Sequence, residues 1–261
     1  MYSNEHRLFL KKIKFKKIFI RIIQIMILLL FIVIWQLLAH YELINTFIFS
    51  SPEKILKCLI NLHQQGNLYN HILITIYETT ISFILGTFIG LVIATIMWWN
   101  KTLAKIIDPY LTILNSLPKV ALGPIIIIWA GAGINSIVAM ALLISVIVTI
   151  INVYQGFINT DSAKIKLLES FKAKKKQIYF KLILPSSLPN LISALKINVS
   201  MSLIGVIMGE FLVSKQGIGY LIMYGSQVFN LDLVITGVFI LGLVATLMYY
   251  IISYIEKRLV K

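Results

Sequence analysis

Residues 161–181 read DSAKIKLLESFKAKKKQIYFK, a basic stretch between long apolar runs. The sequence becomes apolar again through Leu184-Pro185 and Leu188-Pro189, where the prolines predict two turns. The stretch is too short to form a separate domain and too charged to lie in lipid. It is therefore interpreted as a cytoplasmic segment that a membrane protein presents to a partner.

The composition is that of a membrane protein. Of the 261 residues, 59% are hydrophobic and 13% are charged, and the mean hydropathy is +0.89. A hydrocarbon layer about 30 Å thick requires about 20 apolar residues per helix. We therefore expect an all-α polytopic membrane bundle, with a basic tail at residues 1–17 and one transmembrane domain at residues 18–261. About six transmembrane helices are predicted, at residues 18–39, 72–99, 109–129, 134–154, 188–213 and 231–254.

The formal net charge of +14 is unevenly distributed. Basic residues gather before the first span, between the second and third, between the fourth and fifth, and at the end of the chain. The other loops hold Lys54, Lys57 and Lys215. This pattern predicts that both termini are cytoplasmic, and it favours a membrane orientation over nucleic-acid binding. The first run is longer than a signal-peptide core and no small-x-small site follows Ala39, so we expect a retained helix.

Small residues recur every four positions in two of the predicted spans. Ser82, Gly86, Gly90 and Ala94 form one such stripe, and residues 205 and 209 repeat the pattern with two glycines. Stripes of this kind allow the backbones of neighbouring helices to approach closely, so they predict tight helix packing rather than a binding site.

Two acidic residues, Glu78 and Glu210, fall inside predicted spans, where a charge is costly. Each can form a hydrogen bond to a Ser, Thr or Asn of a neighbouring helix. Alternatively, one of them lies on a polar pathway through the bundle. The sequence leaves both interpretations open, and the two residues show no pairing pattern.

The sequence predicts no catalytic or metal-binding residues. The four histidines have no HExxH spacing, and no GxxxxGK[ST] loop is present to bind a nucleotide. The single cysteine, Cys58, excludes an intrachain disulfide and is expected to be an inert thiol on the outer side. Energy for any transport must therefore come from an ion gradient or from another subunit.

Two outer segments are predicted. Residues 51–65 should form a surface helix, with Ser51 as its N-cap, Pro52 in its first turn, and an apolar face. That face comprises Ile55, Leu56, Leu59 and Leu62. Residues 215–230, KQGIGYLIMYGSQVFN, combine three glycines with aromatic residues and should fold back as a short outer segment.

The basic stretch itself predicts an amphipathic helix over residues 161–177. Asp161 suits the N-cap, and Lys174, Lys175 and Lys176 suit the C-terminal end of the helix dipole. Its apolar face consists of Ile165, Leu168 and Phe171. Such a helix either lies against anionic lipid or docks into a groove on a cytosolic partner.

Several segments, in the same order, resemble the permeases of binding-protein-dependent ABC importers, in particular the nitrate, sulfonate and taurine group. The resemblance rests on these segments: SSPEKIL from residue 50, LNSLPKVALGPIIIIWAGAG from 114, NVYQGF from 152, ILPSSLPNLISAL from 183 and GEFLVSKQGIGYLI from 209. The family usually has Glu-Ala-Ala and then Gly in its cytoplasmic helix, and the corresponding positions here are Lys166, Leu167, Leu168 and Lys172. Glu78 is a second departure, because the family often has a basic residue there.

The resemblance implies a type I ABC importer permease in the cell inner or plasma membrane. Its partners would be two ATPase subunits, an extracytoplasmic solute-binding protein and a second permease copy, with surrounding lipid. The chain itself would bind no cofactor, since ATP and Mg would belong to the ATPase. The implied ATPase contacts are Ile165, Leu168, Glu169, Phe171, Lys172 and Ala173, with Pro185 and Pro189 as an elbow. The implied pathway or gate residues are Glu78, Glu210, Gly217, Gly219 and Tyr220.

A second hypothesis is an ion-coupled secondary transporter or channel in which Glu78 and Glu210 bind the ion. Such proteins often have repeated halves, and no convincing repeat is present in this sequence. Dependence on ATP would separate the two hypotheses. Under the first, the solute would be a small organic anion of the sulfonate, nitrate or taurine class, or a related small molecule. The choice between a permease homodimer and a heterodimer stays open.

Overall fold

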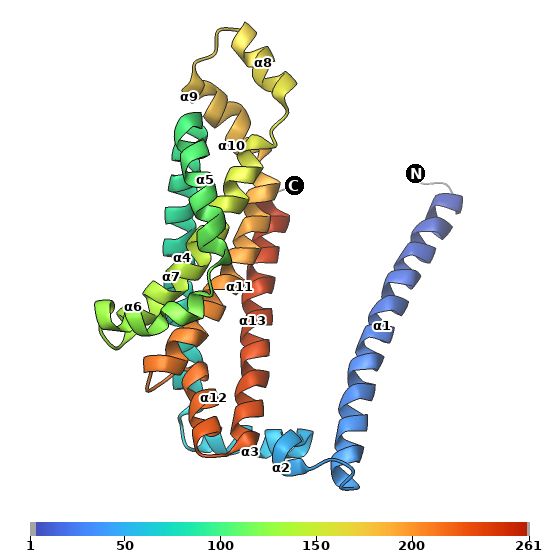
Figure 1. Ribbon diagram of the computed structural model, residues 1–261. Helices are drawn as coiled ribbons and strands as arrows, with labels where there is room; N and C mark the ends of the chain where they lie inside the picture. Colours follow the sequence, from blue (N-terminus) through green and yellow to red (C-terminus); the bar gives the residue numbers. More distant parts are fainter. Residues whose placement is uncertain (1–3, 260–261) are drawn as a thin grey trace.

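The computed structural model describes residues 4–259, and every regular element in that range is helical (Figure 1). Five helices are long and apolar enough to cross a membrane. They are α1 (Asn4–His40), α4 (Leu68–Trp99), α7 (Ile134–Ile158), α11 (Leu188–Val213) and α13 (Leu231–Leu259). The prediction of an all-α polytopic bundle is confirmed, with the third predicted span as the exception described below.

The short elements gather at the two ends of the bundle (Figure 1). One end, called the α8 end, carries α8 (Ser162–Ser170), α9 (Lys175–Ile178), the π-helical segment η2 (Tyr179–Ile183) and α10 (Leu184–Ser186). The other, called the α3 end, carries α2 (Thr46–Phe49), α3 (Pro52–Gln64) and α12 (Ile218–Gln227). The start of α1 and the end of α13 both lie toward the α8 end (Figure 1).

The third predicted span, residues 109–129, is wrong as a single helix. The chain forms α5 (Lys101–Ser116), a 3-10 turn η1 (Lys119–Leu122) and α6 (Gly123–Ala130), and the two arms are bent by 88°. Leu117 has an extended backbone, as the residue before a proline prefers, and Pro118 lacks the N–H that would continue α5. The break follows from this local sequence.

The tight packing predicted from the small residues is confirmed. A Cβ placed on Gly205 of α11 would lie 2.4 Å from the Cα of Ala141 in α7, and one on Gly90 of α4 would lie 2.5 Å from Cγ2 of Thr149 in α7. These distances are too short for a side chain. The three helices α4, α7 and α11 therefore meet with their backbones in close approach.

The N-terminal helix stands apart from this bundle (Figure 1). In the most apolar part of α1, none of the residues is buried. The predicted boundary between a tail and the first span, at residue 18, is not a structural break, because α1 runs through it from Asn4. Residues 1–3 of the predicted tail lie outside the described residues.

The predicted surface helix is α3, and its cap is confirmed. The Oγ of Ser51 accepts a hydrogen bond from the backbone N–H of Lys54 at 3.2 Å, and Pro52 occupies the first turn. Ile55 and Leu62 are buried, whereas Leu56 is 60% exposed and does not pack against the bundle.

Candidate functional sites at the two ends of the bundle

The basic stretch folds as two helices instead of the single one predicted over residues 161–177. The Asp161 carboxylate accepts from the N–H of Ala163, which confirms its cap, but α8 ends at Ser170. The N–H groups of Lys172 and Ala173 donate to the carbonyls of Glu169 at 2.8 Å and Leu168 at 3.0 Å. This pattern is a Schellman motif, which closes a helix with one left-handed residue.

Lys172 is that left-handed residue, with φ of +58°. The motif favours glycine at this position because a Cβ there is costly. It is also the position at which the resemblance led us to expect glycine. The chain therefore makes the turn with a lysine, and the geometry of α8 does not depend on the missing glycine.

The two faces of α8 differ from the prediction. Ile165, Leu168 and Ala173 pack against the chain's own core at the α8 end, which includes Phe157 and Tyr179. On the outer side, Phe171 is 73% exposed and Leu167 is 56% exposed. Phe171 is thus available to a partner, as predicted, whereas Ile165, Leu168 and Ala173 hold α8 in place. Leu167 was missed because the apolar face was assumed to follow strict three-residue spacing.

The lysines that were expected to end the helix begin the next one. Lys174 is the N-cap of α9, and its N–H donates to the side chain of Gln177 at 2.7 Å. Lys175 donates from Nζ to the carbonyl of Trp99 and lies 5.5 Å from the centre of the Trp98 ring. These contacts join α9 to the end of α4.

The residues of the predicted proline elbow are almost all helical. Pro185 lies in α10 and Pro189 in the first turn of α11, where a proline is tolerated because its missing N–H would have no helical partner. Ser187, between them, keeps φ and ψ of −87° and −3°. Both prolines therefore sit at helix starts, and Ser187 between them keeps helical backbone angles where the prolines had predicted turns.

At the α3 end, the loop before α12 is held by side chains of α4 and α11. The N–H groups of Gly217 and Ile218 donate to His71 Nδ1 at 3.0 Å and Thr75 Oγ1 at 2.8 Å. The N–H of Gly219 donates to Glu210 Oε2, and Thr75 Oγ1 donates to Glu210 Oε1 at 2.6 Å. Three otherwise unpaired donors of the first turn of α12 are thus satisfied. We call this set of contacts the Glu210 clasp.

Both glycines of the loop are required by this clasp. A Cβ on Gly217 would lie 2.3 Å from Cδ of Glu210, and one on Gly219 would lie 2.7 Å from its Oε2. Gly217 also has φ of +104°, a conformation that other residues rarely adopt. Tyr220 stacks on His71 with ring centres 5.9 Å apart, which helps to hold the first turn of α12 against α4.

Glu78 and Glu210, which the sequence left unpaired, are neighbours in the structure. Glu78 lies one turn after Thr75 on α4, is buried, and is close enough to Glu210 for the two carboxyl groups to interact. Glu78 Oε2 is buried and has no hydrogen-bond partner within residues 4–259. Both oxygens of Glu210 are occupied by the clasp, so Glu210 has the structural role that the first interpretation gave it. This arrangement disfavours an ion site there.

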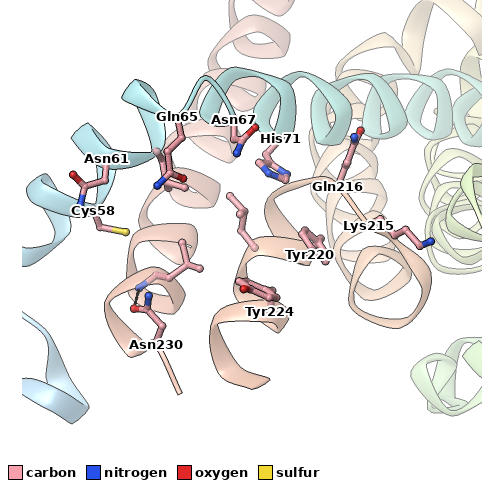
Figure 2. Close-up of a pocket in the computed structure, with 13 residues that line it drawn as sticks. Cys58, Asn61, Gln65, Asn67, His71, Lys215, Gln216, Tyr220, Tyr224 and Asn230 are labelled. Carbon is pink, nitrogen blue, oxygen red and sulfur yellow. Dashed lines mark hydrogen bonds between the residues drawn. The ribbon is translucent and has the colours of Figure 1, made fainter. Parts of the chain in front are cut away.

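A cavity of about 520 Å³ opens beside the Glu210 clasp, between α3, α4, α12 and α13 (Figure 2). No aspartate or glutamate lines it. Its lining is rich in hydrogen-bond donors: Asn61, Gln65, Asn67, His71, Lys215, Gln216, Tyr220, Tyr224 and Asn230. Cys58 lies at its edge, and burial raises the pKa of the Cys58 thiol, in agreement with an unreactive cysteine.

Two further charged residues lie within the helical bundle and were missed. Lys196 of α11 pairs with Glu256 of α13 at 2.5 Å, and Lys119 lies at the break between α5 and α6. Both were visible in the sequence as lysines inside predicted apolar runs. Glu256, the partner of Lys196, was not recognisable in the same way, because it lies beyond the predicted end of the last span.

The comparison with known families agrees with this architecture. Residues 86–261 match the family described as binding-protein-dependent transport system inner membrane component. Because the match covers more than half of the chain, the chain belongs to this family. It is accordingly a multi-pass permease subunit of an ABC importer and not an enzyme. Permeases of this kind work with separate ATPase subunits and with binding proteins.

Three curated relatives cover most of the chain. A probable ABC transporter permease protein of Haemophilus influenzae is 28% identical, over 88% of this chain and 93% of its own length. The putative aliphatic sulfonates transport permease protein SsuC of Bacillus subtilis is 27% identical, over 88% of this chain and 83% of its own length. The formylaminopyrimidine transport permease protein ThiX of Halalkalibacterium halodurans is 29% identical, over 88% of this chain and 92% of its own length.

Solved structures show the same fold. A chain of the MetNI methionine ABC transporter in an inward-facing conformation superposes with a TM-score of 0.69 at 18% identity, over 75% of this chain and 97% of that chain. The resemblance to ABC importer permeases that was drawn from the sequence is confirmed.

Proposed function

We propose that two copies of this chain form the pathway of an ATP-driven importer for a small organic anion of the sulfonate, nitrate or taurine class, or a related small molecule. The observation that carries the coupling part of this proposal is the outer face of α8. Phe171 and Leu167 are exposed there beyond the bundle, while the inner face of the same helix is packed. An exposed apolar patch on a short, firmly seated helix suits a groove on the ATPase.

A run of consecutive helical elements, which ends in the long helix α11, links this contact to the opposite end of the bundle. The segment from α9 to α11 follows α8 directly, and α11 ends beside Glu210 at the clasp. With 26 residues, α11 is about 39 Å long. Movement of α8 when the ATPase closes would therefore reach the loop of Gly217 and Gly219 through one rigid element. This gives the proposed gate residues a physical connection to ATP binding.

The proposed orientation places the α8 end in the cytoplasm. Most basic residues outside the helical bundle lie at that end, and the start of α1 and the end of α13 lie toward it as well (Figure 1). The solute-binding protein would then dock at the α3 end. ATP and Mg would be bound by the ATPase.

The cavity at the α3 end supports an anionic solute. Lys215, His71 and several amide side chains line it, and no carboxylate does (Figure 2). Anions are favoured where donors converge without opposing negative charge. Two relatives are named for the transport of aliphatic sulfonates and of formylaminopyrimidine. The proposed solute class is therefore broader than sulfonates alone.

The test is co-purification of the detergent-solubilised chain with an ATPase from its host. Phe171→Asp should abolish recovery of the ATPase. Phe229→Asp is the matched control, since Phe229 is 75% exposed but lies at the α3 end. Recovery by wild type and by the control alone supports the proposal. Recovery by all three, or by none, contradicts the docking face.

A further inference from the structure

A second cavity, of about 590 Å³, lies beneath α8. It is bounded by the end of α4, the start of α5, the end of α7 and the segment from α8 to α9. The exposed outer face of α8, with Phe171, is not part of its lining. The cavity is therefore separate from the exposed face of α8 on which the proposed ATPase contact depends, although Ile165, Glu169 and Ala173, which the resemblance implied as ATPase contacts, line it.

The rim of this cavity is basic. Lys101 and Lys105 lie one turn apart on the same side of α5, and Lys175 enters from α9. A single acid, Glu169, lines the cavity against these three lysines. Lys175 is held in place by the carbonyl of Trp99 and by the Trp98 ring. A fixed lysine beside two further lysines suits a phosphate group.

The wall of the cavity is apolar. Trp98 and Ile165 contribute to it, together with aromatic and aliphatic residues of α7 and α9. Inorganic phosphate would leave such a wall uncovered, whereas a lipid presents a phosphate and an acyl chain side by side. The pairing of a basic rim with an apolar wall therefore points to an amphipathic ligand.

The position of the cavity along the helices agrees with a lipid headgroup. The apolar helix α4 ends at Trp99, and α5 begins two residues later at Lys101. Tryptophans next to lysines at the end of a membrane helix are typical of the interface with water. Under the proposed orientation this is the cytoplasmic interface, whose lipids carry net negative charge.

We propose that this cavity binds an anionic phospholipid, with its phosphate between Lys101, Lys105 and Lys175 and the start of an acyl chain against the wall of Trp98 and Ile165. Such a lipid would connect α8 to α5 and so stabilise the position of α8 on the bundle. The inference relies on the proposed function only for the side of the membrane. ATPase co-purification does not test it.

The experiment is a titration of the full-length, delipidated chain in detergent with short-chain phosphatidylglycerol, with binding followed by native mass spectrometry. The double variant Lys101→Gln and Lys105→Gln removes two of the proposed phosphate contacts. The matched control is Lys164→Gln with Lys166→Gln, which removes the same charge from exposed positions of α8 outside the cavity. Phosphatidylcholine and glycerol phosphate serve as a lipid without net charge and a headgroup without chains.

We expect the affinity for phosphatidylglycerol to fall about 25-fold in the cavity variant, or about fivefold for each lysine, and to stay within twofold in the control. Glu169→Gln should raise the affinity about fivefold, which gives a second readout that does not depend on loss of binding. Equal binding by the cavity and control variants would overturn the proposal. So would equal binding of phosphatidylcholine, or binding of glycerol phosphate as tight as that of the lipid.

Discussion

Glu210 accepts hydrogen bonds from two buried donors, the N–H of Gly219 and the hydroxyl of Thr75. In Glu210→Ala the N–H of Gly219 loses its acceptor and Thr75 Oγ1 keeps only the carbonyl of His71, 3.2 Å away. An unsatisfied buried group costs about 1–3 kcal/mol. We expect a loss of about 3 kcal/mol, or roughly 6–12 °C in Tm for a chain of this size. Thermal unfolding in detergent would measure this fall in Tm.

Glu53→Ala is the control for this experiment, because Glu53 makes only an exposed ion pair with Lys57 and its loss should leave the Tm unchanged. An unchanged Tm in Glu210→Ala together with lost transport would instead favour an ion-binding role for the acidic pair.

Lys172 offers a second prediction for a single residue. The left-handed conformation of residue 172 costs a residue with a Cβ about 1–2 kcal/mol. Glycine avoids this cost, but its more flexible unfolded state offsets part of the gain in stability. Lys172→Gly should therefore stabilise the chain by up to about 1 kcal/mol. Lys172→Val should destabilise it, because a β-branched residue tolerates positive φ least. Denaturation midpoints of the two variants should move in opposite directions, and a shift in the same direction would refute the strain argument.

The sequence located the important single residues better than it described their contacts. The resemblance placed Lys172 where a glycine is expected, and the structure puts the left-handed turn there. The neighbourhood of Glu78 and Glu210 was not predictable, because their contact depends on how α4 and α11 pack over a separation of more than one hundred residues. A single sequence contains no local pattern for such a contact.

At the scale of elements, the contact between α7 and α11 depends on glycines of α11. In Gly205→Ala the new Cβ would lie 2.4 Å from the backbone of Ala141, so the helices must separate. Overpacking of this kind costs about 1–3 kcal/mol. Gly242→Ala in α13 is the matched control, since no atom lies within 4 Å of its Cβ position, and alanine favours a helix. Thermal unfolding should show a lower Tm for the first and an equal or higher one for the second.

The elements that sequence reasoning described wrongly are those in which local chemistry acts against the average hydropathy. Pro118 and the residue before it end α5, although the surrounding run is apolar enough to be counted as one span. In the basic stretch, the helix was extended to Gln177 because lysines suit a helix end. The Schellman hydrogen bonds at Lys172 and Ala173 end it seven residues earlier. In both places the decisive signal was a single backbone conformation.

At the scale of the whole molecule, the break between α5 and α6 constrains what surrounds this face. Ser116 lies about 24 Å along α5 from its start near the interface, which is within a hydrocarbon layer of about 30 Å. The chain there is a 3-10 turn that includes Lys119, followed by the Gly131–Gly133 loop after α6. Irregular backbone and a lysine do not face lipid at this depth. Protein or water must cover them.

The proposed permease pair meets this requirement if the pathway runs along the α5 and α6 face of each copy. We therefore predict that Ser116→Cys, in a Cys58→Ser background, reacts with a charged, water-soluble thiol reagent in membranes. Ile84→Cys, at the middle of α4 and 58% exposed, should not react, because it would face lipid. Mass spectrometry of the labelled chain measures both. Labelling of Ser116→Cys should also respond to ATP, since closure of the ATPase would change access to the pathway. An unreactive Ser116→Cys, or equal labelling at both positions, would place the pathway elsewhere in the bundle.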